Sequence, residues 1–296
     1  MSAHPVRILS GPTASGKTRL ALDWARRTGG WILSCDALLF YRGADIGTAK
    51  PPPAELREIP HYGIDLREPD RPYNLPEYIS YARGVLEEAG RRGVPVLVVG
   101  GSGFYLSAFH EPAPDPLPVP EAIRDRVRDL ENTRGADGLR EALLAIDPDP
   151  VVDLRNPRRT APALERCLAA GMTTRQLRER HRALPCPFEE WKREWFVAGA
   201  RGDTHPGRIA ERTEGMLRAG LIEEVKRLRA AGFERNPALR SAIGYRETLE
   251  CLDGELPERE LAEAINRHTR RLAARQRRWI RNRLPESRPV ETADDL

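Results

Sequence analysis

The sequence predicts an α/β fold in which a parallel sheet forms the core, with a helical insert and a C-terminal helical region. Short apolar runs, typical of buried parallel strands, alternate with helical stretches in the first hundred residues. A proline-rich segment then precedes helical stretches without intervening strands, and a long amphipathic pattern lies near the C-terminus. We therefore expect a core over residues 1–115, an insert over 116–190, and a return to the core with basic C-terminal helices over 191–296.

The first unit of the core is a strand over Val6–Ser10, a loop over Gly11–Thr18 and a helix over Arg19–Thr28. The loop Gly11-Pro12-Thr13-Ala14-Ser15-Gly16-Lys17-Thr18 matches G-x-x-x-x-G-K-[ST] between a strand and a helix. In such a loop backbone N–H groups converge on phosphate oxygens, the lysine adds a full charge, and the last hydroxyl can bind Mg²⁺. The sequence therefore predicts a P-loop in a core like that of P-loop NTPases, with no need for a nucleoside.

Further strands are expected over Trp31–Cys35, His61–Leu66, Val94–Val99 and Glu194–Ala200. A helix is expected over Leu75–Arg92, between the second and third of them. These short runs are apolar enough to be buried on both faces of a parallel sheet.

The segment Glu111–Pro120 holds five prolines, which neither a helix nor a central strand tolerates. We interpret it as a rigid linker. Helices over Glu121–Leu144 and Ala161–Ala183 are expected to form the insert, and amphipathic helices over Arg208–Ala231 and Glu258–Arg283 the C-terminal region.

The composition is that of a globular chain, 40% hydrophobic and 31% charged, with a net charge of +4. All but four of the 48 basic residues are arginine, which suits an anionic partner but also fits codon bias or a hot habitat. The four cysteines have no C-x-x-C spacing, which argues against a zinc site or a disulfide framework. With no signal segment and no apolar run long enough to span a membrane, we expect a cytoplasmic protein. We also expect it to act as a monomer.

One acid follows a strand next to the P-loop unit: Asp36, after Trp31–Cys35. P-loop NTPases commonly place an Asp at the end of a later strand, but Val94–Val99 ends in glycines. Strand ends on this edge of a parallel sheet face the ligand crevice, so Asp36 is expected near the phosphate site. Three roles are open to it: Mg²⁺ ligand, general base for a nucleophile beside the phosphate, or cap of the next turn.

The residues Asn266–Arg283 include eight arginines and no acid. On a helix, Ile265, Leu272, Gln276 and Trp279 share one face, and the arginines spread over the others. Contact with RNA phosphates and a solvated surface helix are the two interpretations. We interpret Trp279 as a core anchor rather than a base-stacking platform.

Several blocks follow the P-loop in a distinctive order. They are Asp36-Ala37-Leu38-Leu39-Phe40-Tyr41-Arg42-Gly43, Gly47-Thr48-Ala49-Lys50-Pro51, Gly100-Gly101-Ser102-Gly103-Phe104-Tyr105, Asn156-Pro157-Arg158-Arg159 with Ala163-Leu164-Glu165, Gly244-Tyr245-Arg246-Glu247, and Ala273-Ala274-Arg275-Gln276 with Trp279. Together they resemble the motifs of the tRNA dimethylallyltransferase (isopentenyl-tRNA transferase) family.

The chain departs from the family's pattern at individual positions. These are Ala37 in place of Ser, Ser102 in place of Thr, Asn156 in place of Asp, Pro162 in place of Arg, Ala274 in place of Lys and Arg278 in place of Thr. They bear on single RNA contacts, and none lies in the P-loop or at Asp36.

The resemblance implies transfer of a dimethylallyl group from dimethylallyl diphosphate to the N6 amine of the adenine 3′-adjacent to the anticodon in tRNA, with release of diphosphate. It implies Mg²⁺ as cofactor, at Thr18, and the tRNA anticodon stem-loop as partner. Diphosphate binding is expected at Gly11–Thr18, and catalytic roles at Asp36, Ser102 and Arg212. The expected tRNA contacts are Asp36, Ala37, Leu38, Leu39, Ser102, Arg124, Arg158, Arg159, Arg275 and Arg278.

Blander interpretations remain for single residues: Arg212 as a solvated arginine on a helix face, and Ser102 as an ordinary turn serine. For the whole chain, a P-loop small-molecule kinase is the alternative enzyme, although the Gly-Gly-Ser-Gly strand end and the basic helix argue against it. A non-catalytic RNA-binding protein would explain the arginines but would leave Lys17, Thr18 and Asp36 without a purpose.

Overall fold

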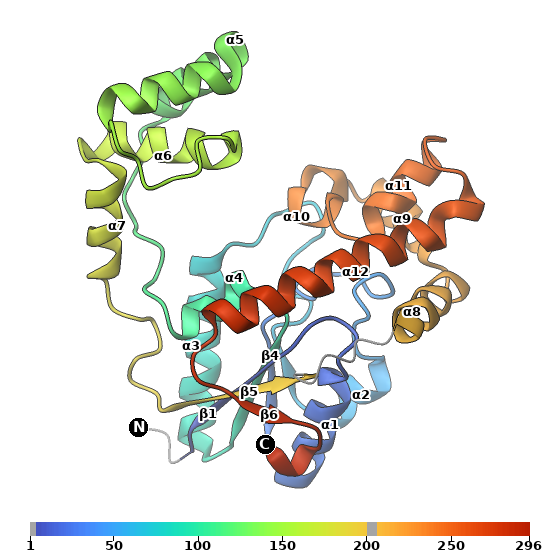
Figure 1. The fold of residues 1–296 in the computed structure, drawn as a ribbon. Coiled ribbons are helices and arrows are strands. Elements are labelled where there is room, and N and C mark those ends of the chain that lie inside the picture. Colours follow the sequence, from blue (N-terminus) through green and yellow to red (C-terminus); the bar gives the residue numbers. More distant parts are fainter. Residues whose placement is uncertain (1–3, 200–205) are drawn as a thin grey trace. The chain divides into compact units, whose positions relative to one another are not determined.

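The structure, a computed structural model, describes residues 4–199 and 206–296. Within them, six strands form one parallel sheet in the order β3-β2-β4-β1-β5-β6 (Figure 1). The strands span Val6–Ser10 (β1), Trp31–Ser34 (β2), His61–Tyr62 (β3), Val96–Gly100 (β4), Arg193–Ala198 (β5) and Arg288–Val290 (β6). The predicted α/β fold with a parallel sheet is confirmed.

Helices cover both faces of this sheet. Successive residues of a strand point to opposite faces, so on β1 Ile8 joins one apolar core and Leu9 the other. Helix α3, Leu75–Arg92, contributes to the first core, and helix α1, Lys17–Thr28, contributes Trp24 to the second. The sheet is therefore fixed from both sides, and its strand ends are held in place for a site.

The C-terminal helices enclose a third apolar core, which also holds Tyr41 and Ala44 from the segment after β2. The longest of them, α12 (Glu258–Arg283), packs against α8 (Pro206–Arg218) and against the short α4 (Gly103–Leu106) (Figure 1). The other C-terminal helices are α9 (Leu221–Ala230), α10 (Pro237–Arg240) and α11 (Tyr245–Leu252), and the short α2 (Pro53–Glu58) lies earlier in the chain. Single 3₁₀ turns lie at Ser107–Phe109, Phe233–Arg235 and Ala293–Asp295. None of the helices described combines the length and apolarity of a membrane span.

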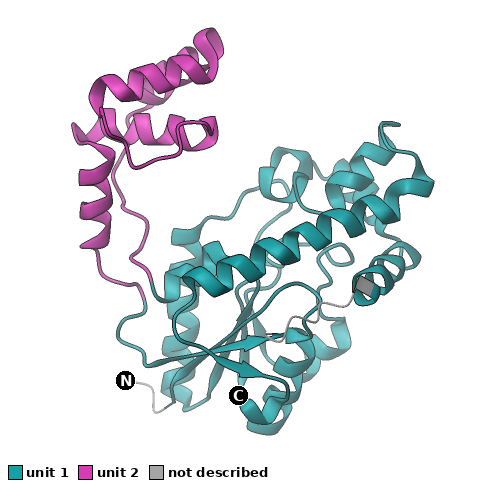
Figure 2. Ribbon diagram, in the orientation of Figure 1, with its two compact units in different colours: residues 1–110, 188–296 teal, residues 111–187 magenta. Residues whose placement is uncertain are grey.

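The chain divides into two compact units: residues 1–110 with 188–296, and residues 111–187 (Figure 2). The second unit consists of α5 (Glu121–Ile146), α6 (Pro157–Ala170) and α7 (Thr174–Arg182) around its own apolar core, which includes Leu139, Leu143 and Leu164. Residues 111–120 enter this unit with neither helix nor strand, as expected for a proline-rich linker.

Two of the helix predictions were wrong, because each predicted helix is a pair of helices in the structure. The stretch Ala161–Ala183 is broken where Gly171 adopts φ 63°, a left-handed conformation that ends α6. The stretch Arg208–Ala231 is broken in the same way at Gly220, with φ 95°. Helix α5 also has a non-helical residue inside it, Gly135.

The strands needed smaller corrections. The predicted strand His61–Leu66 is only two residues long, because the chain turns at Gly63 and Asp65, both with positive φ. The predicted strand Glu194–Ala200 ends earlier, at Ala198, and residue 200 lies outside the described residues. Strand β6 was not predicted: among the strands that the structure describes, it pairs with the end of β5 alone, a long-range contact without a local signal.

Candidate active site

The site is built where three strand ends meet. The P-loop follows β1, Asp36 follows β2 by two residues, and β4 lies between these strands and ends at Gly100. A Cβ on Gly100 would lie 2.4 Å from the carbonyl oxygen of Cys35, so no larger residue fits there. The glycine that ends β4 therefore lets this strand end pack closely against the end of β2, and no acidic side chain stands where an acid ends a strand in a typical NTPase.

The P-loop has the backbone that phosphate binding needs. Ala14 and Gly16 adopt positive φ, at 61° and 89°, and α1 begins directly at Lys17. Alternation of left-handed and right-handed residues turns successive N–H groups toward one point, which forms an anion-binding concavity. The start of the 12-residue α1 adds the positive end of its dipole.

Lys17 folds over this loop, and its Nζ donates to the carbonyl oxygens of Gly11 and Pro12, both at 2.8 Å. Burial lowers the pKa of Lys17 to about 8; the carboxylate of Asp36 raises it and the guanidinium of Arg212 lowers it. A phosphate anion would favour the charged ammonium that burial disfavours. Binding of an anion beside Lys17 would therefore raise its pKa and hold the ammonium in its charged form.

Arg212 reaches the same loop from α8 and donates to the hydroxyl of Thr13 at 3.2 Å. Burial lowers the pKa of Arg212, opposed by Asp36. Arg208 lies one turn earlier on α8, with its guanidinium 3.5 Å from the place a Cβ would take on Gly16. Two arginines of one helix thus face the P-loop, of which sequence reasoning had singled out only Arg212.

Gln276 of α12 ties the P-loop to the end of β4. Its Oε1 accepts from the N–H of Thr13 at 2.8 Å, and its Nε2 donates to the carbonyl of Gly101 at 2.9 Å. The neighbouring Trp279 packs on Gly103, where a Cβ would lie 2.5 Å from its ring. The indole also packs against the core of the sheet, in agreement with its interpretation as an anchor.

These segments line one cavity of about 720 Å³. Its lining includes the P-loop from Thr13 to Thr18, the segment Asp36–Leu39, the strand end Gly101–Phe104, and residues from α8 and α12. Asp36, Ser102 and Arg212, the residues expected to be catalytic, all face it, as do Ala37, Leu38, Leu39 and Arg275. A cavity of this size accommodates a small phosphorylated molecule together with one unstacked base.

Asp36 begins a tight turn as well as lining the cavity. Its Oδ1 accepts from the N–H of Leu38 at 3.1 Å, so the capping role foreseen for it is present. The same carboxylate influences the pKa of Lys17 and that of Arg212, which places it within electrostatic reach of the phosphate site. No hydrogen bond joins Asp36 to Ser102 among the described residues. The position of the Asp36 carboxylate is therefore consistent with all three roles: turn cap, metal ligand and proton acceptor.

Sequence reasoning missed the residue that shapes one wall of the cavity. The buried carboxylate of Glu224 on α9 accepts from the N–H groups of Asp45, Ile46 and Gly47 at 2.7–3.0 Å and from the hydroxyl of Tyr245 at 2.8 Å. All four partners are donors, so the carboxylate fixes the turn that presents Gly47–Ala49 to the cavity. The repeated acids in Glu223-Glu224 look like an ordinary helix surface, and only the fold distinguishes them.

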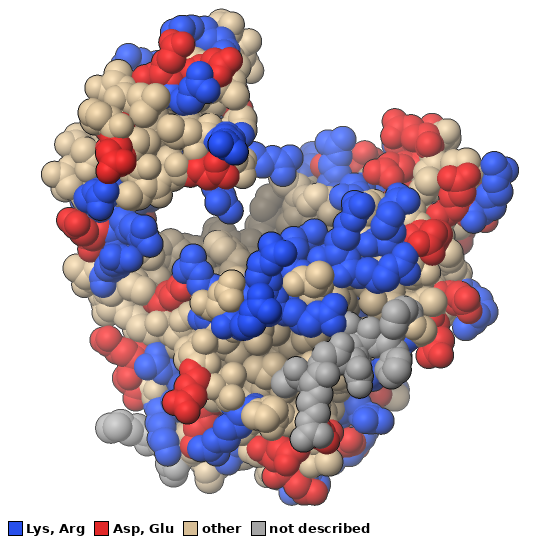
Figure 3. Space-filling view, in the orientation of Figure 1, with Lys and Arg blue, Asp and Glu red and all other residues tan. Residues whose placement is uncertain are grey.

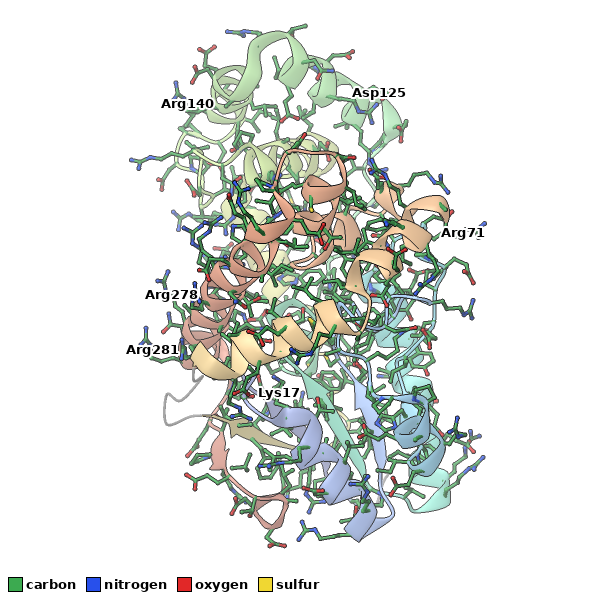
Figure 4. All side chains as sticks on the ribbon, turned by 90° about the vertical axis from the view of Figure 1, so that its right-hand side faces the viewer. Lys17, Arg71, Asp125, Arg140, Arg278 and Arg281 are labelled. Atoms are coloured by element: carbon green, nitrogen blue, oxygen red, sulfur yellow. The ribbon has the colours of Figure 1, made fainter. Side chains whose placement is uncertain are left out.

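The exposed side of α12 is strongly basic (Figure 3). Arg278 and Arg281 point outward from it, whereas Lys17 lies at the start of α1, near α8 (Figure 4). Arg271, Arg275 and Arg278 are exposed and form no ion pair with a carboxylate within the described ranges. Arginines without such partners are available to an anionic surface.

In the second unit, Arg124, Arg158 and Arg159 are exposed, as a contact with RNA requires. Arg124 lies 3.7 Å from Glu121 one turn earlier, and Arg158 and Arg159 lie in the first turn of α6, after its cap Asn156 and Pro157. The Asn156 side chain accepts from the N–H of Arg158 at 3.2 Å, so the Asn keeps the capping ability of the Asp that it replaces.

The residues around the P-loop fit a magnesium ion that arrives with a phosphorylated ligand. Thr18 is exposed and faces the cavity, and the described residues hold no cluster of three or more metal-ligating side chains. Mg²⁺ is usually held by one or two protein groups together with substrate phosphates rather than by an all-protein cage. The arrangement suits that mode.

Comparison with known proteins gives consistent relatives. The family model described as IPP transferase matches residues 39–283. A tRNA dimethylallyltransferase from Opitutus terrae is 44% identical over 97% of this chain and 93% of its own length, and one from Geobacillus kaustophilus is 35% identical over 96% and 89%.

Solved structures agree. The tRNA isopentenylpyrophosphate transferase from Bacillus halodurans is 29% identical, with a TM-score of 0.67, over 97% of this chain and 89% of its own. A eukaryotic dimethylallyltransferase acting on tRNA shares the fold with a TM-score of 0.76 over 94% of this chain and 70% of its own, at 22% identity.

Proposed function

The chain belongs to the IPP transferase family, and from this we propose that it transfers a dimethylallyl group from dimethylallyl diphosphate to the N6 amine of the adenine 3′-adjacent to the anticodon in tRNA. The relatives reported above carry the name of this reaction, and none supports the kinase alternative. The observation that carries the proposal is the single cavity that joins a P-loop to Asp36 across the glycine end of β4.

The leaving group is held by the P-loop. Its amides, the ammonium of Lys17 and the guanidinium of Arg212 bind the diphosphate, with Arg208 at the rim. Negative charge grows on the diphosphate as the allylic C–O bond breaks, so these groups bind the transition state better than the ground state. Mg²⁺ bound at Thr18 would supply further neutralisation of that charge.

The nucleophile is the adenine amine. Its nitrogen lone pair forms the bond to the allylic carbon while the C–O electron pair departs with diphosphate, and the amine then loses one proton. This amine is a weak nucleophile because its lone pair is delocalised into the ring. Asp36, within electrostatic reach of the phosphate site, accepts the proton as general base.

The adenine must leave its stack to enter the cavity, which is the usual route by which enzymes reach an atom of a base. The basic face of α12 belongs to the same compact unit as the cavity, and it binds the RNA backbone. The arginines of the helical insert, Arg124, Arg158 and Arg159, bind the anticodon stem-loop as well. The protein acts as a monomer in this proposal.

The test uses unmodified tRNA with Mg²⁺ and either labelled dimethylallyl diphosphate or labelled ATP. Label from the first donor should pass to tRNA without ATP, and nuclease digestion should recover it in one adenosine beside the anticodon. An obligatory requirement for ATP would overturn the proposal. Lys17→Ala should reduce turnover but preserve tRNA affinity, because Lys17 contacts the donor side of the cavity.

A further inference from the structure

The cavity carries one side chain that neither the fold nor the reaction explains: Phe104. Its exposed fraction is 63%, against 36% for Leu144 and Val151, the other large exposed apolar residues of the described chain. It lines the cavity two residues after Ser102. Solvent exposure of an aromatic ring forgoes about 2 kcal/mol of hydrophobic stabilisation, which a ligand that covers the ring would recover.

Neighbouring contacts hold Phe104 at the cavity. Tyr105 is buried against Phe40 and Tyr78, and its hydroxyl donates to the carbonyl of Tyr73 at 2.9 Å. On the other side, Gly103 is covered by Trp279, as described above. With Tyr105 directed into the core, the first turn of α4 directs Phe104 outward. The ring is therefore presented by a fixed backbone rather than by a loose loop.

We propose that Phe104 is a stacking platform for one of the two bases that flank the target adenine. This inference rests on the proposed function, because it takes tRNA as the substrate. An exposed aromatic ring next to basic side chains is typical of proteins that bind unstacked nucleotides. Here Arg275 of α12, exposed and free of carboxylate partners in the described residues, lines the same cavity as Phe104.

The dimethylallyl chain is a less suitable partner. Its carbocation-like carbon must be shielded from water, which requires a buried wall, whereas most of the Phe104 ring is accessible to solvent. A base at the mouth of the cavity would cover the ring and at the same time replace the stacking that the extruded adenine has lost.

The experiment measures the affinity of the full-length protein for a fluorescent anticodon stem-loop by anisotropy. Phe104→Ala should weaken RNA binding by about 5- to 150-fold, the range for loss of one base–aromatic stack. Phe104→Tyr should bind within about twofold of the parent, since the ring is retained. The affinity for dimethylallyl diphosphate should be the same in both variants, and the melting temperature should change little, because the ring is mostly exposed and meets the fold through an edge contact with Tyr105.

Stem-loops that lack one base, at the position 5′ or 3′ of the target, complete a double-mutant cycle. At the stacked position, loss of the base should remove most of the penalty of Phe104→Ala, and at the other position the two losses should add. Addition at both positions, or wild-type RNA affinity in Phe104→Ala, would overturn the proposal. So would a change in donor affinity with RNA affinity preserved. Label transfer by the parent protein in the same samples tests the reaction itself separately.

Discussion

The pH dependence of donor binding follows from the state of Lys17. Burial lowers its pKa to about 8 in the ligand-free protein. A diphosphate favours the charged ammonium, so the pKa rises in the complex and binding takes up a proton between the two values. Affinity should therefore be highest below pH 8 and fall as the pH rises through it. A group of pKa about 8 is about nine-tenths protonated at pH 7 and about one-tenth at pH 9, which predicts about a tenfold loss of affinity.

Isothermal titration of dimethylallyl diphosphate between pH 6.5 and 9.5, roughly the range that brackets this pKa, measures the effect. Lys17→Arg is the matched control, since a guanidinium stays charged throughout and its curve reports only the titration of the donor and of bound Mg²⁺. The difference between the two curves is the contribution of Lys17. Parallel curves for the two proteins would refute the reasoning and would mean that the lysine keeps its proton in the free protein.

Three further changes have defined outcomes. Gln276→Ala removes two hydrogen bonds between the P-loop and the end of β4, and should raise the KM for the donor by about 5- to 30-fold with little effect on RNA affinity, measured by steady-state kinetics and anisotropy. Glu224→Gln replaces one carboxylate oxygen with an NH₂ donor, which would face N–H groups that are themselves donors. The variant should lower the free energy of unfolding by about 1–3 kcal/mol in denaturant titration, and an unchanged value would contradict the role assigned to Glu224. Neutralising three exposed arginines of α12, Arg271, Arg275 and Arg278, should reduce the slope of log tRNA affinity against log salt concentration by about two. An unchanged slope would mean that these arginines are solvated and do not contact RNA.

The parts of the fold that the sequence predicted well have local causes. The P-loop unit, β1 and α1 with the loop between them, is encoded by a contiguous motif. Helix α3 was predicted with its observed bounds, because Asn74 and Glu77 form a capping box at its start and Gly93 ends it. The breaks after α6 and α8 were missed although glycines mark them, because a helical period continues on both sides and glycine alone does not stop a helix.

The parts of the site that sequence did not predict depend on long-range contacts. Gln276 bonds to Thr13 across 263 positions of the chain. Glu224 acts on a turn 177 or more positions earlier. In neither case does residue spacing or hydrophobic periodicity in the sequence identify the hydrogen-bond partner. The exposure of Phe104 is likewise set by the packing of Tyr105 and Trp279 around it, and not by its own identity.

The central claim is that Asp36 removes the proton of the adenine amine opposite a diphosphate held in the P-loop. The most direct test is single-turnover transfer by Asp36→Asn at saturating tRNA, donor and Mg²⁺, with donor affinity and melting temperature measured on the same protein. The account predicts a rate about 10²- to 10⁴-fold lower with donor affinity preserved, since the amide keeps an acceptor for Leu38 but lacks basicity. A shift of the Mg²⁺ requirement together with the rate would favour a metal ligand instead, and a normal rate with a lower melting temperature would reduce Asp36 to a cap and contradict the claim.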